Sequence, residues 1–420
     1  MVHFLIVLNN IYTFLINLYA MIHKPADSIQ DIQKFGEYGG VNPSIADSST
    51  FTYLKASTMQ AVFEGEQEGC HLYTRHTNPS TSYLAEALAG MENTEAAYVA
   101  SSGMGAITTC TLQICKSGDE IIASRTIYGG TYAFFKNFLP RLGIKVHFID
   151  ITKTEQIAAL INQNTKMVYC ETMSNPLLEI ADLPAISNLT KDTAIQFVVD
   201  NTFTPLLLTP KELGADIVIH SLTKYINGAS DAVGGVVCAD AEFIASMLDV
   251  NQGAGMLLGP VMDSLRAASI LKNMRTLSIR MKQHSSNALY ITEQFTKDGI
   301  KAFYPGAKTH PQHQLLTNMM HNEFGYSGMF VVDVKTKENA YAFMEAMQND
   351  NIGYLAVSLG FYKTLFSAPG TSTSSEIPAE EQKEMGLSPG MVRVSIGLDN
   401  DIERTYLKMK KCMKSVGIVS

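Results

Sequence analysis

Two short segments of the 420-residue chain contain residue types that bind phosphate and form covalent bonds to carbonyl groups. The GMG segment at 103–105 follows an apolar run and precedes a helical stretch, so its backbone N–H groups are expected at a helix N-terminus, where phosphate is favoured. Ser221, Thr223 and Lys224 follow the run DIVIH, and a Lys directly after a buried strand suits a desolvated amine that forms a Schiff base. The alternatives are a tight turn at the glycines and a Ser/Thr helix cap with an incidental Lys.

Three further residues extend this hypothesis to a complete cofactor site. Asp200 ends the apolar run IQFVVD, where a carboxylate is costly without a partner, so it is either a helix cap or the acceptor for a cationic ring nitrogen. Tyr128 either stacks on a ring or is an ordinary core aromatic. Arg75 either clamps a phosphate or forms a surface salt bridge. A Schiff-base Lys, an acidic partner for a ring nitrogen and a phosphate site are together what pyridoxal 5′-phosphate (PLP) requires.

The elements that must position these residues are short apolar runs that alternate with helical stretches. Near-continuous apolar strands between helices predict an α/β fold, with a mostly parallel seven-stranded sheet covered by helices on both faces. Ligands of such sheets bind beyond the carboxyl ends of the strands, so Ser102 and Glu171 are also at positions of interest. The predicted strands are AAYVASS, DEIIASR, KVHFID, KMVYCE, IQFVVDN, DIVIHS and GGVVCAD.

The pattern changes after about residue 275, where longer helical stretches enclose the strand-like segments GMFVVDV and MVRVSIG. This predicts a smaller α+β domain over 276–420, after a large domain over 78–275. Residues 1–77 show no clear core pattern and are expected to be an extension and arm that contacts a neighbouring subunit. Their apolar stretch at 4–20 is an extension before Met21, an arm on another subunit, or a targeting or membrane segment.

The composition excludes several classes of protein. Charged residues make up 17% and the net charge is −8 without a long basic run, which argues against disorder and against nucleic-acid binding. The six cysteines form no C-x-x-C pair and are interpreted as free thiols in a reducing, cytoplasmic compartment. No metal-ligand motif is present, so no metal is expected. A small-molecule partner and no membrane association are expected.

The chain resembles, over residues 35–415, the Cys/Met metabolism family of PLP enzymes. The motifs YTRHTNP, SSGMGA, YGGT, ETMSNP, VVDNTF, HSLTKY, AVSLG and VRVSIG occur in the family's order. The resemblance implies PLP fold type I, as in aspartate aminotransferase, and a homotetramer built from dimers that share active sites. It also implies that Tyr73 and Arg75 reach into a neighbour's phosphate site.

The resemblance carries a role to each matching position. Lys224 is expected to form the Schiff base, Asp200 to bind the ring nitrogen, and Tyr128 to stack on the ring and transfer protons. The residues expected to bind the cofactor are Tyr73, Arg75, Ser102, Gly103, Met104, Tyr128, Asp200, Ser221, Thr223 and Lys224. Those expected to bind the substrate are Asn175, Ser358 and Arg393.

The substrate is the least determined part of the prediction. The segments YPGAKTHPQH and YLAVSLGFYKTLFSAPGTSTSSEI are most similar to plant-type methionine γ-lyases, which eliminate methanethiol from L-methionine. Many microbial methionine γ-lyases have a Cys where this chain has Gly130. The loop before Ser358 contains the mostly apolar residues Ile352, Tyr354, Leu355 and Val357, with Asp350 as the only nearby charge, which favours methionine. The alternatives are a cystathionine γ-lyase, a cystathionine γ-synthase or an O-acetylhomoserine sulfhydrylase, and, from another class, a non-catalytic scaffold.

Overall fold

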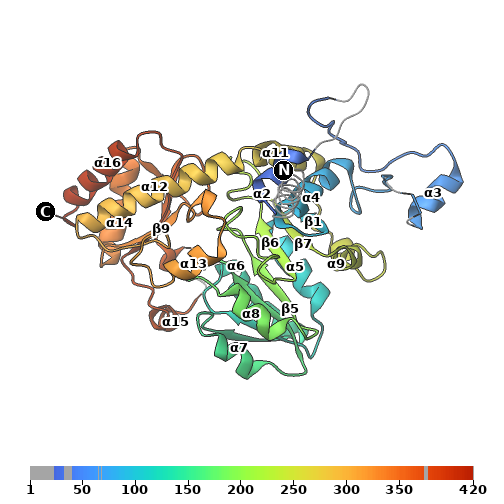
Figure 1. Ribbon diagram of the computed structural model, residues 1–420, viewed down its shortest axis with the longest axis horizontal. Helices are drawn as coiled ribbons and strands as arrows, with labels where there is room; N and C mark the ends of the chain where they lie inside the picture. Colours follow the sequence, from blue (N-terminus) through green and yellow to red (C-terminus); the bar gives the residue numbers. More distant parts are fainter. Residues whose placement is uncertain (1–22, 33–39, 65, 68, 373–376, 420) are drawn as a thin grey trace, which may run out of the picture.

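A mixed sheet of seven strands, in the order β1-β7-β6-β5-β4-β2-β3, forms the centre of the larger part of the molecule (Figure 1). The computed structural model describes residues 23–32, 40–64, 66–67, 69–372 and 377–419. All pairings in this sheet are parallel except those of β7, which runs antiparallel to β1 and β6. The seven predicted strands are therefore confirmed: β1 Ala96–Ala100, β2 Glu120–Ser124, β3 Lys145–Ile149, β4 Thr165–Glu171, β5 Gln196–Asp200, β6 Ile217–Ser221 and β7 Gly235–Ala239.

Alternate residues of the strands belong to two different cores, one on each face of the sheet. In β5, Phe197 and Val199 pack in one cluster and Val198 in the other, as the period-two geometry of a strand requires. One face is covered by α4 Pro79–Glu92, α7 Thr154–Leu160, α8 Leu183–Thr190 and α11 Ser264–Met274. The other is covered by α5 Gly103–Ile114, α6 Gly129–Ala133 with its π-helical continuation Phe134–Phe138, the 3-10 turn Leu139–Leu142, α9 Ala241–Met247 and α10 Ala254–Leu258.

The second part of the molecule contains a five-stranded sheet with the order β10-β11-β12-β9-β8. All of its pairings are antiparallel except β10 with β11, so the predicted smaller α+β region is present. Its strands are β8 Ala302–Phe303, β9 Met329–Asp333, β10 Gly353–Leu355, β11 Thr364–Ser367 and β12 Met391–Ser395. Its helices are α12 Leu277–Lys297, α13 His313–Met319, α14 Lys337–Asn349, α15 Ala379–Glu384 and α16 Ile402–Ser415, with 3-10 turns at Asn322–Phe324 and Pro369–Thr371.

The N-terminal segments lie differently on this body. Helix α2 Pro25–Asp31 packs against α4, whereas α3 Ala56–Phe63 has no buried residue and stands away from both sheets in Figure 1. The expectation for residues 1–20 lies outside the described residues, and the domain limits at 77 and 275 stay a prediction. Within the described ranges, no helix combines the length and apolar character needed to cross a membrane.

Two helix starts bring polar backbone groups to defined places. Helix α5 begins at Gly103 because Ser102 caps it, its hydroxyl accepting a hydrogen bond from the Gly105 N–H at 2.9 Å. Helix α4 begins with Pro79, whose fixed φ suits the first turn, after Asn78, whose side chain accepts from the Ser80 N–H at 2.9 Å. Only the first of these two starts opens towards the candidate active site described next.

Candidate active site

A cavity of about 230 Å³ lies where β4, β5 and β6 end, between the two sheets. Its lining comes from the ends of these strands, the start of α5, and two segments of the C-terminal part. The lining residues are Ser102, Gly103, Met104, Ile107, Tyr128, Glu171, Met173, Asn175, Asp200, Thr202, Phe203, Ser221, Thr223, Lys224, Val233, Val357, Ser358, Leu359 and Arg393. They include every residue expected to bind cofactor or substrate except Tyr73 and Arg75.

Lys224 provides the only amine in this lining. It follows the last residue of β6 by three positions, and its Nζ donates to the Ser358 hydroxyl at 3.3 Å. Burial, and secondarily the charge of Arg393, lower the pKa of the Lys224 amine to about 8. An amine with this pKa is partly neutral near neutral pH and can act as a nucleophile or a base.

Two buried carboxylates, Asp200 and Glu171, lie side by side at the ends of β5 and β4, where they are paired in register. Asp200 accepts hydrogen bonds from the Thr202 N–H at 3.0 Å and the Tyr169 hydroxyl at 3.4 Å. Glu171 accepts from the N–H groups of Tyr128 at 2.7 Å and Asn175 at 2.9 Å. Burial raises the pKa of both carboxyl groups, and the neighbouring Asp200 raises that of Glu171 further. A cationic partner between them would relieve this cost.

The start of α5 forms one end of the cavity together with the hydroxyls that follow β6. A Cβ added to Gly103 would lie 2.9 Å from the Cβ of Ser221, so glycine is needed for this close approach. The Thr223 hydroxyl is held by the N–H of Gly234 at 3.1 Å, and the Ser221 N–H donates to the Thr202 hydroxyl at 2.8 Å. Backbone N–H groups at a helix start beside two hydroxyls suit a phosphate.

Tyr128 lines the cavity from the side of α6. It is the N-cap residue of that helix, and its side chain is 43% exposed. A Cβ added to Gly130 would lie 2.6 Å from Cε1 of Tyr128, so Gly130 allows the phenol ring to fold back over its own helix. The exposed ring is free to stack against a planar group in the cavity.

Arg393 brings a second positive charge to the cavity from β12. Its side chain is buried, its Nη1 donates to the Asn175 Oδ1 at 2.9 Å, and its Nη2 lies 3.5 Å from the Ser358 carbonyl oxygen. Burial lowers its pKa to about 10. A guanidinium held this way from both sides is suited to bidentate binding of a carboxylate.

Tyr73 and Arg75 lie outside this cavity. Tyr73 is 47% exposed, and Arg75 donates to the carbonyl oxygen of Met256 at 2.8 Å and lies over the Tyr73 ring at 5.6 Å. Within one chain, these two residues do not meet the other predicted cofactor-binding residues.

Several lining residues have no assigned role in the sequence-based prediction. Glu171 ends one predicted strand and Thr202 follows Asp200 by two positions, so both are expected only as residues at strand ends. Met173, Phe203 and Val233 are apolar residues like those of the core, and nothing in the sequence distinguishes them.

Of the apolar residues in the loop before Ser358 that were expected near the substrate, only one lines the cavity. Val357 lines the cavity, whereas Ile352 packs in the C-terminal core and Tyr354 lines an adjoining cleft. Leu355 is exposed.

Comparison with known proteins gives the same family from sequence and structure. Residues 27–405 match the sequence pattern of the Cys/Met metabolism PLP-dependent enzymes. The chain is similar to methionine gamma-lyase of Arabidopsis thaliana, with 41% identity over 92% of this chain and 89% of the relative. It is also similar to cystathionine gamma-lyase of Bacillus subtilis, with 36% identity over 86% of this chain and 91% of the relative.

A solved structure of cystathionine gamma synthase from Xanthomonas oryzae pv. oryzae in complex with cystathionine superposes with a TM-score of 0.85. Its identity is 31%, and the match covers 94% of this chain and 99% of that one. The chain therefore belongs to the Cys/Met metabolism family of PLP-dependent enzymes, with the fold type I architecture expected from the sequence.

The residues of the cavity fit PLP. An amine of lowered pKa at Lys224 and a buried carboxylate at Asp200 are the two groups that a Schiff base and a pyridinium nitrogen require. The hydroxyls of Ser221 and Thr223 lie beside the glycine start of α5, which provides the donor set for a phosphate.

Proposed function

We propose that this protein is a methionine γ-lyase, which converts L-methionine and water to methanethiol, 2-oxobutanoate and ammonia by α,γ-elimination. The reaction breaks the bond between Cγ and sulfur, the sulfur leaves as methanethiol after gaining a proton, and water releases the nitrogen as ammonia. PLP, when bound, supplies the electron sink for both proton removals.

One observation carries the choice of methionine. The charged side chains in the cavity lining are Glu171, Asp200, Lys224 and Arg393. Glu171 is occupied by two backbone N–H groups, and the other three are required by cofactor and substrate. Among the described lining residues, no charge is left over for the second amino-acid head group of cystathionine. The apolar wall suits a thiomethyl group, which loses affinity beside unpaired polar groups.

The proposed roles follow the contacts of each side chain. Lys224 binds the cofactor and, once the substrate amine has replaced it, moves the Cα proton, for which an amine with a pKa of about 8 is well matched. Asp200 binds the ring nitrogen and favours its protonated form. The Tyr128 hydroxyl donates a proton to the leaving sulfur, and its ring stacks on the cofactor.

Substrate and phosphate are bound at opposite ends of the cavity in this proposal. Arg393 binds the α-carboxylate, with Asn175 holding the guanidinium and Ser358 lying between it and Lys224. At the other end, the α5 start binds the phosphate through the backbone of 102–104 together with the hydroxyls of Ser221 and Thr223.

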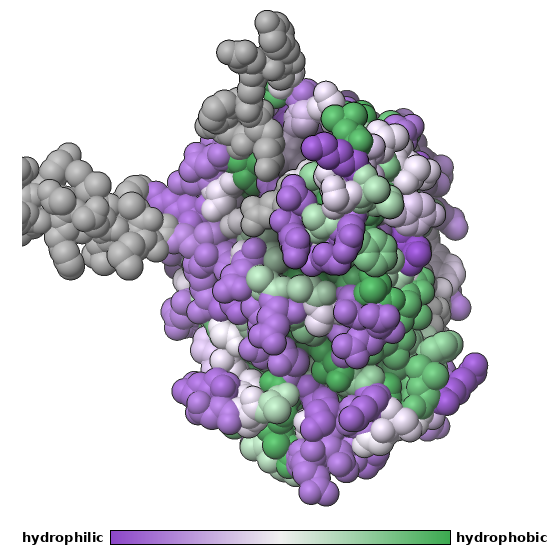
Figure 2. Space-filling model, turned by 90° about the vertical axis from the view of Figure 1, so that its right-hand side faces the viewer, coloured by the Kyte–Doolittle hydropathy of each residue, from purple (hydrophilic) through white to green (hydrophobic). Residues whose placement is uncertain are grey.

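Completion of the site by a second copy is part of the proposal. An open cleft of about 690 Å³ meets the cavity at Thr223, Val233 and Ser358, and we propose that Tyr73 and Arg75 of a neighbouring subunit enter there. The exposed apolar residues Val41, Leu54 and Phe63 of the N-terminal segment support its burial in a homotetramer. Figure 2 shows hydrophobic residues gathered on the face from which this segment extends.

The buried free thiols Cys110, Cys115, Cys170, Cys238 and Cys412 support a reducing, cytoplasmic location.

The test is a parallel comparison of kcat/KM for L-methionine, L-cystathionine, L-cysteine and O-acetylhomoserine with purified holoenzyme. Methanethiol and 2-oxobutanoate should form from methionine, and methionine should be preferred over cystathionine. A clear preference for cystathionine would overturn the proposal in favour of a cystathionine γ-lyase. Incorporation of an added thiol into O-acetylhomoserine with little elimination would instead indicate a sulfhydrylase.

A further inference from the structure

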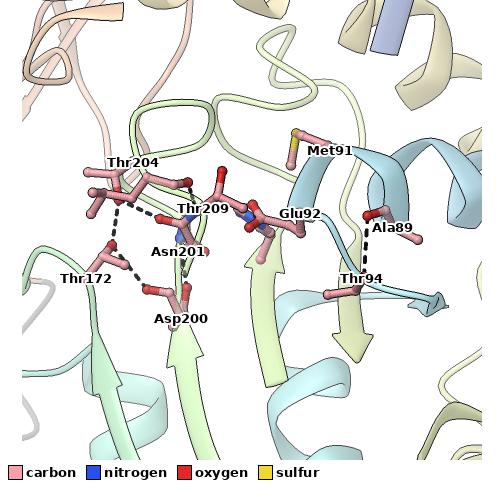
Figure 3. Close-up of polar contacts among 12 residues, drawn as sticks. Ala89, Met91, Glu92, Thr94, Thr172, Asp200, Asn201, Thr204 and Thr209 are labelled. Carbon is pink, nitrogen blue, oxygen red and sulfur yellow. Dashed lines mark hydrogen bonds and ion pairs between the residues drawn. The ribbon is translucent and has the colours of Figure 1, made fainter. Parts of the chain in front are cut away.

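A buried pair of side chains, Glu92 and His220, lies behind the strand ends and does not line the cavity. Glu92, the last residue of α4, and His220, in β6, are 1% and 0% exposed, and the Glu92 Oε1 lies 2.6 Å from the His220 Nε2. The same oxygen accepts a second hydrogen bond, at 3.1 Å, from Asn201, which follows β5. Figure 3 shows Glu92 reaching from the end of its helix to the segment that carries Asn201 and Asp200.

The pair is expensive to bury and only partly compensated. Within the described part of the chain, the second oxygen of Glu92 and the Nδ1 of His220 have no hydrogen-bond partner. Buried polar groups that are only partly hydrogen-bonded contribute little net stability, because their desolvation offsets the hydrogen bonds that they form. A role in fixing the geometry of neighbouring groups is therefore the stronger explanation for the presence of the pair.

The partners of Glu92 are the sequence neighbours of active-site residues. Asn201 directly follows Asp200, and His220 directly precedes Ser221. Asn201 is held further by the Thr204 hydroxyl, which donates to its side-chain oxygen at 2.6 Å, and the Asn201 N–H donates to the Ile219 carbonyl of β6 at 2.8 Å. One carboxylate thus joins Asn201, which follows β5, to His220 of β6, next to the residue Asp200.

Charges from several elements act on Asp200 and on the pair. Tyr169 and Glu171 of β4 lie on the same face of the sheet as Asp200, whereas Cys170 of β4 and His220 of β6 lie on the opposite face. The charge of His220 lowers the pKa of Asp200, against the larger effect of burial, which raises it. Glu92 faces His220, Cys238 of β7 and His321. In this set His220 and Asn201 are the side chains that donate hydrogen bonds to Glu92 directly.

We propose that Glu92 is a positioning residue for Asp200: through Asn201 and His220 it holds the ends of β5 and β6 together, and so fixes the place of the carboxylate proposed to bind the cofactor ring. This inference rests on the proposed role of Asp200. It assigns a function to a buried side chain that does not line the cavity.

The substitution Glu92→Leu removes the acceptor of both hydrogen bonds, and Glu92→Gln is the conservative variant that keeps it. In Glu92→Gln the amide oxygen can still accept from both His220 and Asn201, and the amide nitrogen takes the place of the oxygen that has no partner. We expect Glu92→Leu to lower kcat for methionine about tenfold, while KM changes less than about twofold because Arg393 is untouched. Glu92→Gln should restore most of this loss in kcat.

Asp216→Asn is the matched control. Asp216 also joins β5 to β6, accepting from the Phe197 N–H at 2.7 Å, but at the opposite ends of the strands. This variant should lower thermal stability without lowering kcat. If it lowers kcat as much as Glu92→Leu does, the effect is general destabilisation and the proposal is wrong.

A second variant keeps the test decisive. His220→Leu removes the link to β6 while Glu92 stays, so it should lower kcat in the same way, and His220→Gln, whose amide can still donate to Glu92, should lower it less. A folded Glu92→Leu with an unchanged kcat would overturn the inference, and so would failure of both Glu92→Leu and His220→Leu to fold, because the pair would then serve folding alone. Asp200→Asn separates the two proposals: if it is impaired while Glu92→Leu is not, only the inference fails, and if Asp200→Asn is itself unimpaired, the proposed role of Asp200 fails.

Discussion

The cavity and the N-terminal segment that carries Tyr73 and Arg75 differ in what holds their residues in place. Asp200, Glu171 and Lys224 are fixed by strand pairing and burial within one chain. Arg75 is held by one hydrogen bond to a carbonyl oxygen, and Tyr73 is nearly half exposed. The motif YTRHTNP, which contains Tyr73 and Arg75, matches the family as well as the motifs VVDNTF and HSLTKY, which contain Asp200 and Lys224. A motif therefore identifies residues that act together, but the positions of those residues depend on contacts that one chain does not always provide.

The largest effect is expected on the cavity side, from Lys224→Ala. Loss of the only amine in the lining should abolish the visible absorbance of the bound cofactor and reduce turnover by about 1000-fold or more. Absorbance spectra and methanethiol release measure the two effects on one sample. Full activity together with bound cofactor would contradict the assignment.

Asp200→Asn should bind PLP yet lose most activity. A neutral amide cannot stabilise a protonated ring nitrogen, so kcat should fall by more than about tenfold, which corresponds to about 1.4 kcal/mol. Cofactor content and kcat should be measured together, with Asp216→Asn as the control carboxylate. Unchanged turnover would exclude a role for Asp200 at the ring.

The pH dependence of cofactor binding tests the environment of Lys224. Because burial lowers the pKa of this amine to about 8, the neutral, reactive form increases as pH rises through 8. The rate of PLP binding to the apo protein should therefore rise about tenfold between about pH 7 and 9 and then level off. Reaction of PLP with a free amine corrects for the titration of the cofactor itself. A rate that keeps rising through pH 10 would mean that Lys224 is not desolvated.

Arg75→Ala tests whether the N-terminal segment that carries Tyr73 and Arg75 takes part in a neighbouring subunit's site. If Arg75 contacts a phosphate in a neighbouring subunit, PLP affinity should fall about tenfold, as expected for a hydrogen bond between charged groups. Mixing this variant with Lys224→Ala should restore part of the activity, because some hybrid sites combine an intact Lys224 with an intact Arg75. Hybrids that stay inactive despite demonstrated subunit exchange would count against shared sites.

The smallest effect is expected from Val357→Glu, which adds a carboxylate to the apolar wall. We expect kcat/KM for methionine to fall about fivefold and that for cystathionine to rise, because the new charge can pair with a distal ammonium group. Val357→Leu, which keeps the wall apolar, is the matched control. An unchanged ratio of the two substrates would show that Val357 does not contact the distal end.

The sequence was sufficient for the strands and for most of the candidate site, for a physical reason. An apolar run such as IQFVVD identifies a buried strand, and the polar residue that ends it then lies at the edge where ligands bind. The same reasoning cannot identify apolar lining residues such as Met173 and Val233, because their side chains are of the same type as those buried in the core. It also fails for Glu92 and His220, because their partnership joins a helix end to a strand 128 positions away, and no local pattern encodes that contact.

The order of the cavity residues along the chain has a consequence for synthesis on the ribosome. The groups proposed to bind cofactor within one chain lie between residues 102 and 224, whereas Ser358 and Arg393 come from the last part of the chain. The roughly 170 residues between Lys224 and Arg393 take about 10–30 s to add at about 5–20 residues per second. During that interval the nascent chain contains its own proposed ring- and phosphate-binding residues without the guanidinium proposed to bind the substrate carboxylate. The residues proposed to bind cofactor are therefore synthesised before those proposed to bind substrate.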